Sequence, residues 1–265
     1  MTTDIPGLNP NVPNAARIYD YLLGGTRNFE ADRGAAEYMA SLLPSTRKWL
    51  RMLRDSLGQY ARQLSAEGFT HFIDFGSGLP DRGHLHAAAP SAKVVYSDKD
   101  PATVAQARAL LGDTPNVLYL QHDLRQAKEL LESDEVRAFL DGERKIAFGA
   151  SGITDFLSEA ELRKLASDLY SFAAPGSKLF ITFETKDPNL STPRWEQFVG
   201  MFQQMGEPFS LHPIEAYLDM CRPWTVDAHG VVPVAKLLGH PDDYVTEADR
   251  EGVGIEFYAV ILEKK

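Results

Sequence analysis

Apolar residues near the amino terminus recur with helical spacing. Over 15–23 they follow an i, i+3, i+4 stripe, which predicts a short helix ended by the glycine pair that follows. The same spacing predicts a second helix over 29–41, which Asn28 would cap, and a longer third helix over 46–66. We therefore expect residues 1–68 to form a helical extension packed on the rest of the chain.

After residue 68 the pattern changes to short apolar runs separated by amphipathic segments. Five runs predict buried strands, over 70–76, 92–98, 116–123, 144–151 and 177–184. Strands that alternate with helices form a parallel sheet with right-handed crossovers. Two last runs, near 224–234 and over 254–263, have no long helix between them, which predicts an antiparallel hairpin. The predicted fold over 69–265 is α/β, a Rossmann-like doubly wound sheet, mostly parallel with an antiparallel edge.

Local signals mark the ends of two of the intervening helices. Asp100 and Pro101 have the types preferred at the start of a helix, and Gly112 would end it. Ser158 and Glu161 have the spacing of a capping box at the start of the other.

The end of the first predicted strand carries the clearest chemistry. It reads Asp-Phe-Gly-Ser-Gly over 74–78, and the second strand ends at Asp98, 20 residues after Gly78. The glycines let a ligand approach the backbone, and a carboxylate at this distance can accept hydrogen bonds from ribose hydroxyls. The sequence therefore predicts a nucleoside-binding site at this edge of the sheet.

The residues around the loop indicate which nucleoside ligand it binds. A dinucleotide fingerprint would place a third glycine where Asp81 stands, so a pyrophosphate would meet a carboxylate. The acidic surroundings suit a cation such as the sulfonium of S-adenosylmethionine (SAM), and Asp123 at the third strand end could accept from the adenine amine. Two alternatives stay open: Asp98 and Asp123 could merely cap the helices that follow, and the ligand could be a nicotinamide cofactor.

Composition narrows the class of protein. The 265 residues carry a formal net charge of −10, which argues against a nucleic-acid partner because phosphate binding needs clustered basic residues. We expect no membrane partner and no signal peptide, since no long apolar stretch occurs. The single cysteine, Cys221, suits a reducing compartment. These features predict a cytoplasmic enzyme.

Three ordered segments, "DFGSGLP", "VVYSDKDP" and "QHDLR", resemble the first three motifs of Rossmann-like SAM-dependent methyltransferases. More narrowly, "ARIYDYLLGGTRNFEADRGAAE" with "DFGSGLPDRGHLH" resembles the SAM-dependent methyltransferase family once called DUF574. The resemblance is closest over about 12–125, looser to about 183, and weak beyond 190, in the region that usually shapes the acceptor pocket. It implies a seven-stranded sheet with an antiparallel last strand, SAM as cofactor and S-adenosylhomocysteine as product.

Strand ends, loop and resemblance together give the candidate residues. The cofactor candidates are Asp74, Gly76, Ser77, Gly78, His86, Asp98, Lys99, Asp123, Leu124, Ala150 and Ser151. The lid and substrate candidates are Tyr19, Tyr21, Gly24, Gly25, Asn28, Phe29, Asp155 and Glu184. We predict no metal site, and no catalytic base is assigned, because SAM carries an excellent leaving group and needs mainly alignment with its acceptor.

The segment 15–33 is predicted to be a lid over the carboxyl edge of the sheet. In this hypothesis Tyr21 and Phe29 shield the methionine end of SAM, and Asn28 bonds to a polar group there. The hypothesis requires 15–33 to lie within a side chain's reach of the glycine loop.

The predicted function is methyl transfer from SAM to a small-molecule acceptor by in-line displacement, in specialised metabolism, by a protein compatible with a homodimer. One alternative is a SAM-binding or S-adenosylhomocysteine-binding protein of the same fold with a regulatory or non-methylating activity. The second alternative is an NAD-dependent oxidoreductase.

Overall fold

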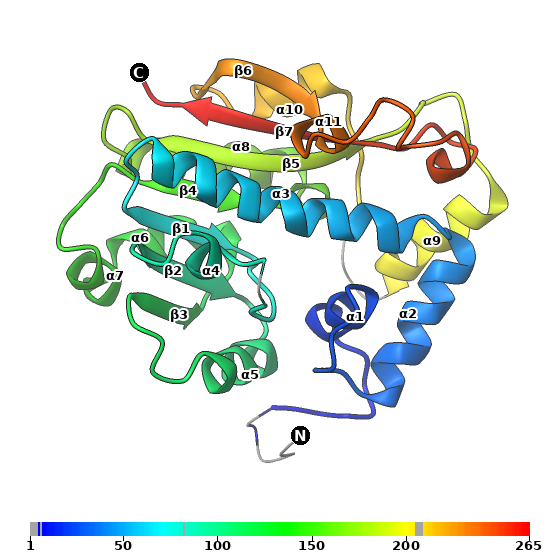
Figure 1. Cartoon of the computed structure of the whole chain (residues 1–265), viewed down its shortest axis with the longest axis horizontal. Helices are drawn as coiled ribbons and strands as arrows, with labels where there is room; N and C mark the ends of the chain where they lie inside the picture. The colour runs from blue at the N-terminus through cyan, green and yellow to red at the C-terminus, as the bar shows by residue number, and fades with distance from the viewer. Residues whose placement is uncertain (1–4, 6, 82, 205–208) are drawn as a thin grey trace.

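The computed structural model describes residues 5, 7–81, 83–204 and 209–265. One sheet has the strand order β3-β2-β1-β4-β5-β7-β6 (Figure 1). The strands are β1 His71–Phe75, β2 Lys93–Asp98, β3 Val117–Gln121, β4 Ala147–Ala150, β5 Lys178–Thr185, β6 Thr225–Pro233 and β7 Glu256–Glu263. The order reverses beside β1, where β2 and β4 flank it, and ligands of such sheets bind beyond the carboxyl ends at this point.

The parallel part of the sheet and the edge hairpin agree with the predicted fold class. β1 pairs in parallel with β2 and β4, and β5 pairs in parallel with β4. The antiparallel strand is β7, the last along the chain, which lies between β5 and the outermost strand β6. The prediction of an antiparallel edge therefore describes the β6–β7 hairpin, with β6 rather than β7 at its outer side.

Helices cover both faces of the sheet. The α-helices are α1 Ala15–Leu22, α2 Glu30–Leu42, α3 Thr46–Ala66, α4 Leu85–Ala88, α5 Pro101–Leu111, α6 Ala127–Glu132, α7 Asp134–Phe139, α8 Glu159–Phe172, α9 Pro193–Gln204, α10 Ile214–Met220 and α11 Val234–Leu237. Short 3-10 turns are η1 Leu124–Gln126, η2 Thr154–Phe156 and η3 Ala248–Arg250. No helix in these described ranges is both long and apolar enough to cross a bilayer.

Alternation along the strands separates two cores. Phe72 and Phe180 face the long helix α3, where the Tyr60 ring packs against Phe180 at 5.1 Å between centroids. Neighbouring residues such as Ile73 and Phe148 point to the opposite face and pack with α8. Figure 1 shows α3 running along one face, with α1, α2 and α9 beyond the carboxyl ends of the parallel strands. The amino-terminal helices are thus placed at the end of the sheet that binds ligands.

The local helix signals are confirmed at both predicted starts. The Asp100 side chain accepts from Thr103 N at 2.6 Å, Pro101 occupies the first turn, and Ser158 with Glu161 forms a capping box. The predicted cap of α2 was wrong by one residue. Phe29 holds the N-cap position and Asp32 supplies the side-chain bond, because Asn28 is used in the preceding turn.

Candidate functional site

The glycine loop after β1 turns sharply at two positions. Gly76 and Gly78 have φ of +63° and +64°, a backbone conformation that residues other than glycine adopt only at a cost in free energy. A Cβ on Gly76 would lie 3.0 Å from Ile153 of the β4–η2 segment, so the loop and that segment are packed closely. Ser77 N donates to Ser97 O at 2.9 Å, which ties the turn to β2.

Both backbone groups of Gly78 are held by side chains from neighbouring strands. Asp98 at the end of β2 accepts from Gly78 N at 3.1 Å, and Tyr119 of β3 donates its hydroxyl to Gly78 O at 2.6 Å. Asp98 also accepts from Asp100 N at 3.0 Å. Each carboxylate oxygen thus keeps a lone pair for a further donor. The acid at the end of β2 therefore lies against the glycine loop, and its role toward a ribose stays a prediction.

Buried His84 and Arg54 of α3 form a pair that holds the glycine loop in place. The sequence did not indicate this pair. His84 Nε2 bonds to Ser77 O at 3.0 Å, while His84 Nδ1 accepts from Asp81 N at 2.9 Å. Arg54 of α3 reaches the ring at 2.9 Å and pairs with Asp81. Burial, with a smaller effect of Arg54, lowers the pKa of His84 to about 4, so the ring is neutral and donates through Nε2. The pair therefore joins α3 to the glycine loop.

His86, a cofactor candidate, contacts the neighbouring strand β2. His86 Nδ1 and His86 N both lie within hydrogen-bond distance of the Tyr96 hydroxyl, at 2.9 and 3.0 Å. These bonds fix the start of α4 against β2, and a role of His86 at the cofactor stays a prediction.

Acidic groups surround the loop. Burial raises the pKa of Asp74 to about 7, with the Ser77 hydroxyl opposing the shift. Burial also raises the pKa of Asp98, against the two backbone N–H bonds that it accepts. A nearby cation would therefore stabilise the ionised form of each carboxylate.

The ends of β3 and β4 supply the remaining cofactor candidates. Asp123 caps η1 by accepting from Arg125 N at 2.9 Å, as its alternative reading expected, and its second oxygen lies 3.5 Å from the Arg125 guanidinium. Leu124 is buried, Lys99 is exposed beside Asp98, and Ala150 ends β4 in the core. Ser151 Oγ lies 3.2 Å from Thr182 Oγ1, which couples the end of β4 to β5.

The predicted lid segment lies against the glycine loop. A Cβ on Gly78 would lie 3.8 Å from Ala16 Cβ of α1, and the Tyr19 ring covers the Arg54 guanidinium at 5.1 Å. Asn14 Nδ2 donates to Asp100 Oδ1 at 3.2 Å, joining the segment to α5. The distance condition set for the lid is met.

The two tyrosines of the segment make different contacts. Tyr21 donates to Glu37 at 2.6 Å, whereas Tyr19 donates its hydroxyl to Leu50 O of α3 at 3.1 Å and its ring covers Arg54. The shielding role of Tyr21 stays a prediction. Phe29 lies under the Arg17 guanidinium at 5.3 Å. A helix presents residues two apart to different sides, and the packing of α1 on α3 decides which side faces inward.

Asn28 is also occupied within the segment. Its Nδ2 donates to Asp20 at 2.8 Å and to Gly25 O at 3.0 Å, and its Oδ1 accepts from Arg33. Gly24 has φ of +87°, and a Cβ on Gly25 would lie 2.1 Å from the Asp20 carboxylate. Asn28 and the glycine pair therefore build the tight turn between α1 and α2, and both N–H donors of the Asn28 amide are used within it.

An apolar cavity of about 90 Å³ lies next to the loop, between α2, α3, α9 and the carboxyl ends of β4 and β5. Gly152 is in its wall, and the neighbouring residue Ile153 is the one that packs on Gly76. The lining residues are Met39, Leu43, Ser45, Thr46, Trp49, Leu50, Leu53, Gly152, Asp155, Phe156, Glu184, Phe198, Phe202, Phe209, Ile255 and Phe257. Only Asp155 and Glu184 among them are charged residues, and both were substrate candidates.

Comparison with known proteins decides the family. The S-adenosyl methyltransferase family matches residues 1–262. The chain belongs to the S-adenosyl methyltransferase family. A solved structure of an inferred methyltransferase from Thermobifida fusca YX is 31% identical, with a TM-score of 0.84 and 98% of each chain covered. A DUF574 family protein from Streptomyces avermitilis MA-4680 is 24% identical, with a TM-score of 0.81 over 96% of this chain and 98% of that chain.

A more distant similarity shows the same fold. Magnesium protoporphyrin IX methyltransferase from Synechocystis PCC 6803, with SAM bound, is 11% identical, with a TM-score of 0.54 and coverage of 98% and 99%. No match to the chain is found among curated proteins. The chain is thus a SAM-dependent methyltransferase, and SAM is its cofactor.

The residues of this methyltransferase fit SAM. The two left-handed glycines leave the loop backbone free of side chains, and Asp98 presents unused lone pairs beside it. The buried acids Asp74 and Asp98 suit a sulfonium cation rather than a pyrophosphate. Within the part of the chain that the structure describes, no group of His, Cys, Asp and Glu is arranged to hold a metal.

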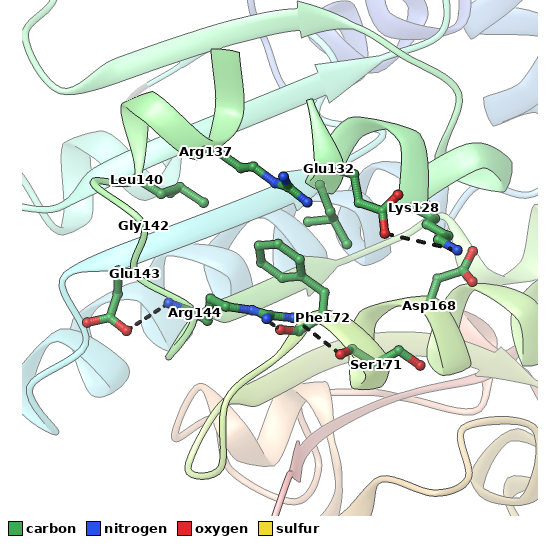
Figure 2. A pocket seen from close by; sticks show the side chains of 11 residues that line it. Lys128, Glu132, Arg137, Leu140, Gly142, Glu143, Arg144, Asp168, Ser171 and Phe172 are labelled. Carbon is green, nitrogen blue, oxygen red and sulfur yellow. Dashed lines mark hydrogen bonds and ion pairs between the residues drawn. The ribbon is translucent and has the colours of Figure 1, made fainter. Parts of the chain in front are cut away.

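A larger hollow, of about 590 Å³, lies elsewhere on the methyltransferase (Figure 2). It is formed by α6, α7, the end of α8 and the segment before β4, at the amino ends of the strands. Arg144 there is bonded to the carbonyl oxygens of Phe172 and Ser171. Because parallel sheets bind ligands at the opposite end, the smaller cavity beside the glycine loop is the better candidate for the acceptor.

Proposed function

We propose that this methyltransferase transfers the methyl group of SAM to a small-molecule acceptor that binds in the apolar cavity. The observation that carries this is the junction between the two sites. The cavity wall includes Gly152, and the next residue, Ile153, packs on the cofactor loop at Gly76. A mostly apolar cavity of this kind suits a small molecule and limits the contact of water with the reacting atoms.

Residues of this chain would hold the cofactor at both of its ends. Asp98 accepts from the ribose hydroxyls, Asp123 accepts from the adenine amine, and Asp74 faces the charged methionine end. Leu124 packs against the adenine, and the backbone of 76–78 approaches the ligand. Bound SAM supplies an electrophilic methyl group on a sulfonium leaving group. The protein then mainly aligns the acceptor in line with the carbon–sulfur bond, which can supply several kcal/mol of the barrier reduction.

The amino-terminal segment 15–33 is proposed to close the site. Support comes from Ala16, which lies against the loop at Gly78, from Tyr19, which covers the Arg54 guanidinium, and from Asn14, which links the segment to α5. SAM entry would then require this segment to lift. We further propose a cytoplasmic enzyme of specialised metabolism, with an acceptor pocket shaped by the residues after 185.

Incubation with methyl-labelled SAM and a broad panel of small molecules tests the proposal. Labelled product detected by mass spectrometry, together with SAM binding by calorimetry, is the expected result. Tight SAM binding with no turnover across the panel would instead favour a regulatory binding protein of the same fold. Binding of NAD but not SAM would overturn the cofactor assignment.

A further inference from the structure

Two acidic side chains meet at the inner end of the acceptor cavity. Asp155 comes from η2 and Glu184 from the end of β5, and both line the cavity. Asp155 is held through one carboxylate oxygen: its Oδ1 accepts from the Tyr217 hydroxyl at 2.5 Å and from Glu184 N at 3.3 Å. Its carboxylate is therefore a fixed part of the wall.

Glu184 differs from Asp155 because its carboxyl group has no protein partner. The residue is only 6% exposed and lines the cavity, and no hydrogen bond or ion pair to its side chain occurs among the residues that the structure describes. Its carboxyl oxygens are not among the fully buried side-chain atoms, so they keep some contact with solvent. No Lys, Arg or His is among the lining residues. Burial, and then the nearby Asp155, raise the pKa of Glu184 well above its usual range. A buried acid without a partner costs the folded protein free energy unless a ligand supplies that partner.

A second polar group in the same wall is also without a partner. The hydroxyl oxygen of Ser45, at the start of α3, is buried and makes no hydrogen bond. Ser45 and Glu184 come from opposite sides of the cavity, the helical extension and the sheet. Two unsatisfied polar side chains in one small apolar cavity indicate that it receives a molecule with a polar end.

Part of the remaining wall is aromatic, and the other lining residues are mostly aliphatic. Phe202 and Phe209 stack with ring centroids 5.1 Å apart, and Phe198 meets Phe202 edge-on at 5.1 Å. Trp49 and Phe257 form a further pair at 4.8 Å. Aromatic faces attract cations as well as apolar groups. The volume of about 90 Å³ is below the roughly 150 Å³ that holds benzene, so a ring would enter with rotation of a wall side chain.

We propose that the acceptor is an amine on an apolar, ring-bearing body, and that Glu184 binds its amino nitrogen and takes up its proton. This inference rests on the proposed function. An ammonium ion compensates negative charge on the two acids and is also attracted by the aromatic faces. A neutral alcohol leaves any charge on the pair uncompensated, and a carboxylate would be repelled by it.

Glu184 ionises when the ammonium binds, and its carboxyl proton leaves to solvent. The carboxylate then takes one N–H proton from the ammonium, which leaves a neutral nitrogen with a lone pair. That nitrogen forms a bond to the methyl carbon while the carbon–sulfur bond breaks, and the bonding electrons stay on sulfur. The products are a methylated ammonium ion and the neutral thioether S-adenosylhomocysteine.

Three probes with the same body test this inference: phenethylamine, phenethyl alcohol and 3-phenylpropionate. Their dissociation constants are measured with the full chain in the presence of S-adenosylhomocysteine, for the wild type, Glu184→Gln and Glu132→Gln. The last variant removes the same charge from an exposed position at the opposite end of the sheet. SAM binding is measured for each protein in parallel.

We expect phenethylamine to bind the wild type at least about tenfold more tightly than the other two probes, since a hydrogen bond to a charged group is the stronger kind. Glu184→Gln should lose about that factor for the amine while keeping its SAM affinity, and Glu132→Gln should behave as the wild type. Equal or absent binding of the three probes to the wild type would overturn the inference, and this comparison holds even if Glu184→Gln fails to fold. Unchanged amine binding in a folded Glu184→Gln would overturn it too. If SAM binds and a non-amine product forms, the proposed function stands and this inference falls.

Discussion

Gly76→Ala tests whether the glycine loop is shaped by backbone conformation alone or also by its contact with the β4–η2 segment. Gly76 has φ of +63°, and an added Cβ would lie 3.0 Å from Ile153 Cγ1 and 3.2 Å from Ile153 Cδ1. Gly239 is a matched control, because its φ is +75° and nothing lies within 4 Å of its added Cβ. The two variants share the backbone cost, and only one has the steric contact.

The expected magnitudes follow from these two terms. A left-handed alanine costs about 1–2 kcal/mol, and overpacking adds about 1–3 kcal/mol. Gly239→Ala should therefore lower the free energy of unfolding by about 1–2 kcal/mol, and Gly76→Ala by about 2–5 kcal/mol. Displacement of the loop by one tight contact should weaken SAM binding by about tenfold or more, since 1.4 kcal/mol corresponds to that factor.

Urea unfolding and calorimetric titration with SAM measure both effects. The double variant Gly76→Ala with Ile153→Ala should recover the steric part of the loss but not the backbone part, which appears as a coupling energy of about 1–3 kcal/mol in a double-mutant cycle. The reasoning is refuted if Gly76→Ala is no more destabilising than Gly239→Ala, or if removing the Ile153 side chain recovers nothing.

Three further predictions concern the acids of the site and lid. Asp98→Ala should weaken SAM binding at least about a hundredfold, because two hydrogen bonds to the ribose of about 1.5–3 kcal/mol each are lost. Asp100→Ala is the control and should mainly lower the stability of the helix that it caps. Near-normal SAM affinity of Asp98→Ala in calorimetry would exclude the ribose role. Asp32→Asn breaks a fully buried pair with Arg17, 2.7 Å apart, so hydrogen exchange over the lid should quicken, and unchanged exchange would show that the pair does not hold the lid. Burial raises the pKa of Asp155 to about 7, so the stability that comes from its protonated form is complete below pH 4 and is lost as pH rises through 7. The unfolding free energy of the wild type, measured relative to that of Asp155→Asn, should therefore fall by up to about 4 kcal/mol across that range. If the unfolding free energies of the two proteins change with pH in the same way, this prediction is contradicted.

The chemistry of the cofactor site could be predicted further from sequence than its acceptor side. The glycine turn and the Asp98 spacing were sufficient because β1 and β2 are adjacent parallel strands, whose carboxyl ends must meet. His84 follows the loop closely in sequence, but its partner Arg54 lies 30 residues earlier, on α3. No pattern within either segment indicates that contact, because it depends on how α3 crosses the sheet.

The segment 15–33 shows which features can be predicted from neighbouring residues and which cannot. Its helices and its glycine turn were predictable, since helix periodicity and left-handed turns are set within a few residues. The side of α1 that packs on α3 was not: Tyr19 lies on Arg54 of α3, whereas Tyr21 donates to Glu37. A helix has the same internal energy at any rotation about its axis, so packing against another element makes that choice.

The sequence by itself determined the order of strands and helices, the caps at Asp100 and Ser158, and the conformation of the glycine loop, because each depends on neighbours along the chain. Only the tertiary structure decided that Asp155 and Glu184 line one cavity with Ser45 and the aromatic residues of α9. Those groups come from segments far apart in the chain, and their burial, their charges and the lack of a partner for Glu184 arise only when the helical extension closes over the end of the sheet.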